Sequence, residues 1–346
     1  MKVIHDGDGA YEDVMALMLL LKHCDVRAVT LVYGEVHGLI GARNMERVCN
    51  YIVPECEIPV AYGRETPLGG FGSPFPDYIR EEADNVLKGI NLPEVSKSKV
   101  RNDAVTLIYE TLMNSNEKIT IIATGPLTNI AELIQHYPEA IKKIERIVIM
   151  GGAIHVTGNI LDIAPNAGNT EAEWNIYADP LAAKLVFEAK IPLLLVPLDI
   201  TNQVPLTKEF YNKIGICKDP ALKLTYEMLT YFFETLGEKQ VAIQLFFWDS
   251  LAAMIAINPN IADYQQLHLM VNLETAKTMV TKNSNPVTVA MSLFNKPLFY
   301  THFIKMMTSP VPFSYKNTTI PLLSFKPRHN NVKEEILDDV VSLATY

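Results

Sequence analysis

The sequence lacks three features that would mark a secreted or membrane protein. It has no long apolar run, since Val14–Leu21 and Ile191–Leu198 are too short to cross a bilayer. It also has no signal peptide, because charged residues follow Met1 too closely. Its four cysteines show no paired spacing of the kind that binds metal. We therefore expect a cytoplasmic protein with reduced thiols and no membrane partner.

Positive charge is also scarce. The formal net charge of the 346 residues is -9, and no stretch rich in lysine and arginine carries interleaved aromatic residues. This charge argues against a nucleic-acid partner. Because 49% of the residues are hydrophobic and only 20% are charged, the chain can bury a large core. We expect a folded globular protein.

Carboxylates gather close to the N-terminus, where an apolar strand meets a helix. Val3 and Ile4 end the strand, glycines permit a turn, and an apolar helix follows from Val14. Asp8 and Asp13 are therefore expected to converge. Carboxylates held this close repel each other unless they are protonated or bridged by a cation. Oxygen ligands of this kind favour Ca²⁺ or Mg²⁺.

Other interpretations of this cluster compete with a cation site. Acidic residues at a helix start often serve only as caps that offset the helix dipole. A phosphatase-type Asp-x-Asp after a first strand also fits the pattern. An EF-hand loop beginning at Asp6 does not fit, because Tyr11 stands where a glycine is needed and Leu17 where a bidentate glutamate is needed.

Apolar strands and helices alternate along the first 200 residues. This alternation predicts an α/β fold with a mainly parallel central sheet and helices on both faces, an open Rossmann-like sheet. We expect one domain over residues 1–346, with a C-terminal extension from about 309 that ends in a docking helix. The expected strands are Val26–Tyr33, Ile58–Tyr62, Lys118–Ala123, Arg146–Met150, Ile191–Leu198, Gln266–Leu273 and Pro286–Leu293.

Polar residues follow several of these strands, at the edge where open α/β sheets bind ligands. Glu35 follows the second strand, and Thr124 follows the strand that ends at Ala123. Glu173 and Asn175 are two residues apart, which in an extended segment points both side chains to one side.

Asp249 stands beside Trp248 at the head of an apolar helix. As a cap it needs no functional role.

Taken together, these segments resemble the nucleoside hydrolase family. Residues Asp6–Asp13 are similar to its Asp-x-Asp-x-x-x-Asp-Asp signature. Further matches follow in the family's order, over roughly residues 2 to 300. They are Thr124-Gly125-Pro126-Leu127-Thr128-Asn129, Met150-Gly151-Gly152, Gly158-Asn159, Glu173-Trp174-Asn175, Asp179-Pro180 and Trp248-Asp249.

The resemblance implies a Ca²⁺-dependent hydrolase that splits ribonucleosides into ribose and free base. It implies Ca²⁺ ligands at Asp8, Asp13, Asp249 and the main-chain carbonyl of Thr124, with Asp8 as general base. It also implies a homodimer or homotetramer. The substrate-binding positions that it implies are Glu12, Glu35, Asn159, Glu173, Asn175 and Trp248.

The base preference follows from the residue before the last aspartate. Family members that prefer inosine and uridine have a histidine there, whereas the purine-specific group has a tryptophan, as here at Trp248. A stacked indole supports a departing purine by aromatic contact. We therefore expect purine ribonucleoside substrates. Phe71, Phe75 and Tyr78 are candidates for a second stacking ring.

Three positions depart from the family pattern. Ala10 stands where glycine or asparagine is usual, Glu12 where aspartate is usual, and Glu35 where asparagine or aspartate is usual. One extra methylene moves a carboxylate by about 1.5 Å, which is enough to disturb a ligand shell. The alternative is therefore a catalytically weak relative that binds nucleoside or ribose.

Overall fold

The computed structural model describes residues 1–54, 57–69, 75–95 and 98–312. Phe71 and the expected C-terminal helix lie outside these residues. Within them, no helix is both long and apolar enough to cross a membrane.

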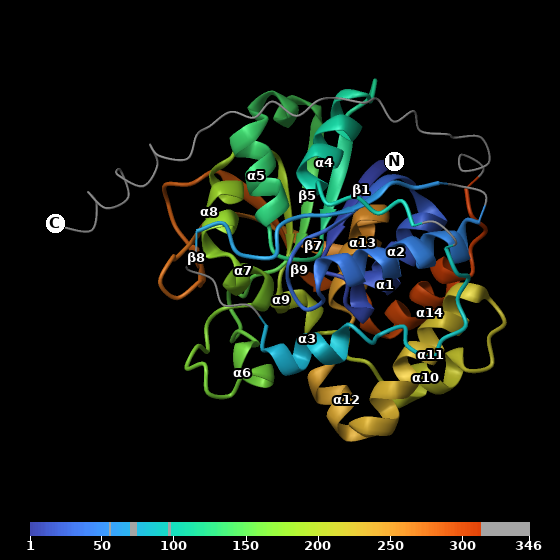
Figure 1. Ribbon diagram of the computed structural model, residues 1–346. Helices are drawn as coiled ribbons and strands as arrows, with labels where there is room; N and C mark the ends of the chain where they lie inside the picture. Colours follow the sequence, from blue (N-terminus) through green and yellow to red (C-terminus); the bar gives the residue numbers. More distant parts are fainter. Residues whose placement is uncertain (55–56, 70–74, 96–97, 313–346) are drawn as a thin grey trace.

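A single sheet runs through the centre of the molecule (Figure 1). Its first six strands are parallel to their neighbours, β6 pairs with β9 in parallel, and β7 is antiparallel to both β9 and β8. The prediction of a mainly parallel sheet is confirmed. The strand order is β3 (Val60–Tyr62), β2 (Asp25–Leu31), β1 (Lys2–Gly7), β4 (Ile119–Ala123), β5 (Ile144–Met150), β6 (Leu193–Val196), β9 (Pro286–Leu293), β7 (Ala262–Val271) and β8 (Thr278–Val280).

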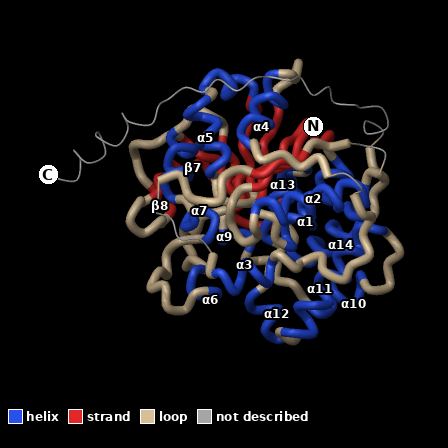
Figure 2. The backbone as a smooth tube through the Cα atoms, viewed as in Figure 1, coloured by secondary structure: helices blue, strands red, loops and turns tan. Residues whose placement is uncertain are grey.

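Helices cover both faces of this sheet (Figure 2). Successive buried residues of a strand point to opposite faces, so Ile122 joins one hydrophobic core and Ile121 joins the other. The first core is closed by α1 (Tyr11–His23), α2 (Gly38–Ile52), α13 (Trp248–Ile257) and α14 (Lys296–Met307). The second is closed by α4 (Ala104–Met113), α5 (Thr128–His136) and α8 (Pro180–Glu188).

The remaining helices are mostly short, and in Figure 1 α3, α6, α11 and α12 lie below the sheet. They are α3 (Asp77–Ala83), α6 (Ile160–Ile163), α7 (Trp174–Ala178), α9 (Leu198–Thr201), α10 (Lys208–Ile214), α11 (Pro220–Thr235) and α12 (Glu238–Gln244), with 3₁₀ turns at Pro138–Lys143 and Pro259–Ile261. The expectation of a largely helical stretch between residues 205 and 244 is confirmed.

Several boundaries differ from the sequence prediction. The strand expected over Ile191–Leu198 is shorter, because Pro197 cannot donate to a neighbouring strand and Leu198 already begins α9. The β7 strand starts at Ala262, and β8 was not predicted. Buried and exposed residues alternate irregularly along β7, and β8 has only three residues. Neither strand therefore has a clear apolar pattern.

The order of the strands places a ligand crevice between β1 and β4. The chain proceeds from β1 through β2 to β3 in one direction and from β4 through β5 to β6 in the other. Open α/β sheets bind ligands at the carboxyl ends of the strands on either side of such a reversal. Asp8 follows β1 directly and Thr124 follows β4 directly, so both lie at this crevice.

Candidate active site

Three hydrogen bonds hold the Asp13 carboxylate at the crevice. Its Oδ2 accepts hydrogen bonds from the main-chain N–H groups of Gly9 and Ala10, at 2.9 and 3.1 Å. Its Oδ1 accepts the hydroxyl proton of Thr124 at 2.5 Å. Asp13 therefore closes the first turn of α1, as the capping interpretation predicts, and it also links that turn to the end of β4.

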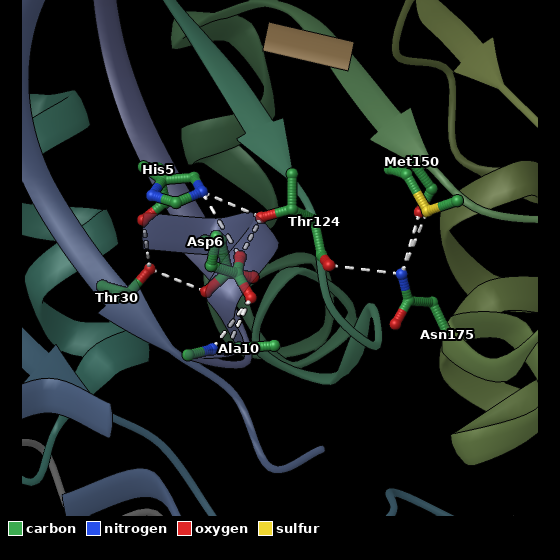
Figure 3. Close-up of polar contacts among 9 residues, drawn as sticks. His5, Asp6, Ala10, Thr30, Thr124, Met150 and Asn175 are labelled. Carbon is green, nitrogen blue, oxygen red and sulfur yellow. Dashed lines mark hydrogen bonds and ion pairs between the residues drawn. The ribbon is translucent and has the colours of Figure 1, made fainter. Parts of the chain in front are cut away.

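A buried histidine extends this network. His5 Nε2 lies 2.8 Å from the Thr124 hydroxyl oxygen (Figure 3). Burial lowers the pKa of His5 to about 4, so the ring is neutral at pH 7. Since Thr124 gives its proton to Asp13, the ring nitrogen donates to Thr124. Sequence analysis did not single out His5, because a lone histidine within a strand carries no signal of its own.

Asp6 lies beneath the crevice and has a structural role. Its Oδ1 accepts hydrogen bonds from the Thr30 hydroxyl at 2.7 Å and the Asn129 amide at 2.8 Å. These bonds tie β1 to β2 and to the start of α5. Burial raises the pKa of Asp6 to about 6.

Asp8 can lie beside Asp13 because two nearby residues, Gly7 and Gly34, have no side chains. A Cβ on Gly34 would lie 2.2 Å from Asp8 Oδ2, and a Cβ on Gly7 would lie 2.0 Å from Asp13 Oδ1. Asp8 Oδ2 also accepts the main-chain N–H of Glu35 at 2.9 Å. Burial, the charge of Asp13 and a hydrogen bond with the Asp13 side chain, in that order, raise the pKa of Asp8 well above its usual range.

Three more carboxylates add negative charge around Asp8 and Asp13. Burial and the charges of Asp13 and Glu12 raise the pKa of Asp249 strongly. Burial and the charge of Glu35 do the same for Glu12, and burial and the charge of Asp8 raise the pKa of Glu35 to about 8. The predicted acidic residues from α1, α13 and the loops after β1 and β2 therefore lie within electrostatic reach of one another.

Glu173 and Asn175 reach the crevice in a different way from the one predicted. The extended segment expected here is wrong, because a helix, α7, begins at Trp174 with Glu173 as its N-cap. The Glu173 carboxylate accepts main-chain N–H groups of Asn175, Ile176 and Gly152, which holds the segment in the helical conformation. Burial raises the pKa of Glu173 to about 7.

Asn175 points its amide nitrogen at two strand ends. It donates to the main-chain carbonyl of Thr124 at 3.2 Å and to that of Met150 at 3.1 Å (Figure 3). The Thr124 carbonyl predicted as a metal ligand therefore accepts one hydrogen bond and keeps a second lone pair.

A pocket of about 590 Å³ opens beside this cluster. Among the predicted residues, Glu12, Glu35, Asn159 and Trp248 line it. Asn159 also accepts the main-chain N–H of Trp174 at 3.1 Å, so it fixes the start of α7 as well.

Aromatic side chains form much of the pocket wall. Tyr11 and Phe232 face it together, with ring centroids 4.9 Å apart. Sequence reasoning missed this pair because nothing local indicates that α1 and α11 meet here. Of the proposed stacking residues, Tyr78 lines the pocket, whereas Phe75 is buried and stacked on Trp174 at 4.2 Å.

The predicted donor set matches a metal ion in its chemistry but not in its spacing. Among the described residues, no group of three or more His, Cys, Asp or Glu side chains is spaced to hold a metal. The predicted ligands are nevertheless all oxygen donors, and Asp8, Asp13 and Asp249 are buried with mutually repelling charges. A hard divalent cation relieves this kind of repulsion. The residues therefore fit such an ion by type and charge.

Buried carboxylates beside an aromatic pocket, at the strand ends of an α/β sheet, are typical of a site for a small organic ligand. A family model described as "inosine-uridine preferring nucleoside hydrolase" matches residues 3–301. The chain therefore belongs to the nucleoside hydrolase family, whose members split ribonucleosides at the sugar–base bond. This result sets the phosphatase interpretation aside.

Individual relatives agree with this assignment. The chain is 36% identical over 239 residues to the pyrimidine-specific ribonucleoside hydrolase RihA of Citrobacter koseri, covering 67% of this chain and 71% of that protein. It is 34% identical over 233 residues to the non-specific ribonucleoside hydrolase RihC of Salmonella enteritidis, covering 67% and 70%. The crystal structure of an inosine-uridine preferring nucleoside hydrolase from Bacillus anthracis superposes with a TM-score of 0.77 at 25% identity, covering 89% of this chain and 99% of that one.

Proposed function

We propose that this nucleoside hydrolase acts on purine ribonucleosides and needs Ca²⁺. The observation that carries the proposal is the buried group of Asp8, Asp13 and Asp249, whose chain neighbours Glu12 and Trp248 line an aromatic pocket. The carboxylates supply the oxygen ligands and the negative charge that the ion requires. The aromatic wall supplies a surface for a planar base.

The negative charge also suits the reaction. Breaking the bond between C1′ and the base nitrogen develops positive charge on the ribose ring, and nearby carboxylates stabilise such a state. When bound, Ca²⁺ lowers the pKa of water and orients the ribose hydroxyl groups. Asp8 takes a proton from the attacking water as general base. Glu173 and Asn175 hold the floor of the crevice in place, and Asn159, Glu12 and Glu35 stand within reach of the sugar.

The base preference rests on Trp248, which lines the pocket at the first turn of α13. No histidine is found among the described residues that line this pocket. A purine offers an indole more stacking area than a pyrimidine does. The proposed preference differs from that stated in the name of the related RihA, so direct comparison of substrates is needed.

The first experiment measures ribose release from inosine, guanosine, adenosine and uridine, with Ca²⁺ and with chelator. We expect purine turnover that disappears in chelator and returns when Ca²⁺ is restored. Equal rates with purines and uridine would overturn the base preference and leave the hydrolase intact. Full activity after exhaustive chelation would overturn the metal requirement.

Glu12 and Glu35 favour a second outcome that the same protein can test. Both stand in the region proposed for the sugar and are longer than the residues they replace. If they block the productive position, calorimetry detects nucleoside binding while ribose release stays at the uncatalysed rate. Glu35→Asp would then restore turnover.

A further inference from the structure

His5 is a buried polar residue in an interior strand of the sheet. Strand β1 pairs with β2 on one side and with β4 on the other, where His5 lies opposite Val29 and Ile122. The residue is only 1% exposed. The two paired neighbours therefore hold the imidazole ring in a fixed position behind the crevice.

One nitrogen of this ring makes no contribution to folding. The Nδ1 atom is buried and has no hydrogen-bond partner in the part of the chain that the structure describes. A buried polar atom without a partner is unfavourable, and the preceding residues, Val3 and Ile4, are apolar and fully buried. An apolar ring would fill the same space without this cost. The contacts of the other nitrogen, Nε2, therefore need a separate explanation.

The Nε2 atom acts on Asp13 through Thr124 and not directly. It lies 2.8 Å from the Thr124 hydroxyl oxygen, which is a hydrogen-bond distance, but 3.5 Å from Asp13 Oδ1. The Thr124 hydroxyl donates in turn to Asp13 Oδ1 at 2.5 Å. Side chains from β1, from the end of β4 and from the first turn of α1 thus form one line of hydrogen bonds (Figure 3).

This line opposes rotation of the Asp13 carboxylate. The main-chain N–H groups of Gly9 and Ala10 hold Oδ2, and the Thr124 hydroxyl holds Oδ1. Loss of the hydroxyl would remove a bond that keeps the carboxylate from turning about its Cβ–Cγ bond. A hydroxyl group that accepts a hydrogen bond is a stronger donor, so the imidazole of His5 strengthens the bond from Thr124 to Asp13.

We propose that His5 is a positioning residue for the cation, because it holds the Thr124 hydroxyl against Asp13 and so orients two predicted ligands. These ligands are the Asp13 carboxylate and the Thr124 carbonyl, which belong to residues 111 positions apart in the chain. The inference rests on the proposed Ca²⁺ requirement and adds a residue that is not itself a predicted ligand. Hydrogen bonds to the ligands of a metal ion fix their orientation and raise the affinity for the ion.

The first measurement is the Kd of the full chain for Ca²⁺, by calorimetry without nucleoside. His5→Phe keeps a flat ring but removes the donor, and we expect the Kd to rise about tenfold. Thr124→Val keeps the main-chain carbonyl but removes the hydroxyl, and the Kd should rise about 30-fold. His5→Gln is the conservative variant, because its amide nitrogen is as many bonds from the main chain as Nε2. Its Kd should stay within about threefold of that of the unaltered protein.

The double variant His5→Phe/Thr124→Val distinguishes one line of contacts from two independent effects. If the imidazole acts only through the hydroxyl, the added His5→Phe changes nothing further. The Kd should then remain about 30-fold above that of the unaltered protein. Independent effects would multiply to about 300-fold, and that result would overturn the proposal.

Thr30→Val is the matched control. Thr30 is also a fully buried threonine, and its hydroxyl donates at 2.7 Å to Asp6, which is not a predicted ligand (Figure 3). The control removes the same chemical group from the neighbouring strand β2 and should leave the Kd for Ca²⁺ unchanged. A rise as large as that in Thr124→Val would show a general disturbance of the strands and would overturn the proposal.

Thermal unfolding in chelator distinguishes positioning of the ligands from a role in folding. His5→Phe should unfold at a temperature close to that of the unaltered protein, because it also removes the unpartnered Nδ1. A lower unfolding temperature with an unchanged Kd for Ca²⁺ would assign His5 to folding and overturn the proposal. That result would leave the Ca²⁺ requirement standing. Failure of the unaltered protein to bind Ca²⁺ would overturn both.

Discussion

The inner and outer parts of the pocket are built differently. At the inner part, behind the lining residues Glu12 and Trp248, Asp8 follows β1 and Asp13 and Asp249 lie in the first turns of α1 and α13; all three are buried, and main-chain N–H groups and glycines fix Asp8 and Asp13. At the outer part, Glu82 and Tyr231 are exposed and are linked only by one side-chain hydrogen bond. The inner part therefore depends on position, because small displacements matter there. The outer part acts through charge and contact area, which tolerate displacement.

The largest difference between the two parts is expected from substitution of the general base. Asp8→Asn keeps the shape of the side chain but cannot take a proton, so kcat should fall by about 10³-fold. Asp162→Asn in the outer wall should change kcat for a neutral purine by at most about threefold. Steady-state kinetics on inosine checks both. A loss for Asp162→Asn as large as that for Asp8→Asn would contradict the division into two parts.

A pH effect on stability is expected from Glu173. Burial raises its pKa from an ordinary 4.5 to about 7, so the folded protein binds a proton more tightly than the unfolded chain does. The contribution of Glu173 to the free energy of unfolding is fully present below about pH 4.5. It decreases by about 3 kcal/mol at most as the pH rises through 7.

Thermal unfolding in chelator, at a series of pH values, tests this effect. Glu173→Gln should unfold at a lower temperature at every pH, because glutamine replaces an acceptor oxygen with a donor. The diagnostic result is a flatter pH dependence between 4.5 and 7. A variant curve parallel to that of the unaltered protein would show that Glu173 does not titrate in this range.

Gly34→Ala tests how closely position governs the inner part. The added Cβ would lie 2.2 Å from Asp8 Oδ2, so Asp8 must move. A displacement of this size at the reacting group should cost about 100-fold in kcat/KM. Gly41→Ala is the matched control. Gly41 lies in α2, and an added Cβ there would make only ordinary contacts, at 3.4 Å or more. Equal activity of the two variants would show that Asp8 has room to adjust.

The sequence predicts that Asp8, Asp13 and Thr124 lie at one edge of the sheet because their placement has local determinants, whereas Asp249 comes from the distant helix α13. The spacing of Asp8 and Asp13 across one turn, and the strand that ends before Thr124, follow from short-range pattern. The placement of both at one edge follows from the general behaviour of parallel sheets. The extended conformation predicted for Glu173–Asn175 was wrong because alternation over three residues cannot distinguish a strand from the first turn of a helix.

The outer part could not be predicted because its contacts join distant segments. Tyr11 meets Phe232 only when α1 and α11 pack together, and neither residue has a motif around it. Phe75 and Tyr78 are close in sequence, yet one is stacked in the core on Trp174 and the other is 58% exposed at the pocket. Propensity and spacing contain no information on that difference.

The smallest expected effect belongs to the outer aromatic wall and distinguishes bases from one another. Trp248→Leu removes a stacking face, which should lower kcat/KM for inosine by about tenfold, at the upper end of what one aromatic contact contributes. Uridine has a smaller ring, so the decrease in kcat/KM for uridine should be about threefold smaller than that for inosine. Trp248→Phe keeps an aromatic face and serves as the control. Because Trp248 precedes Asp249, Ca²⁺ affinity must be measured in each variant. Equal losses for both nucleosides, with Ca²⁺ binding unchanged, would show that the indole supports the pocket without selecting the base.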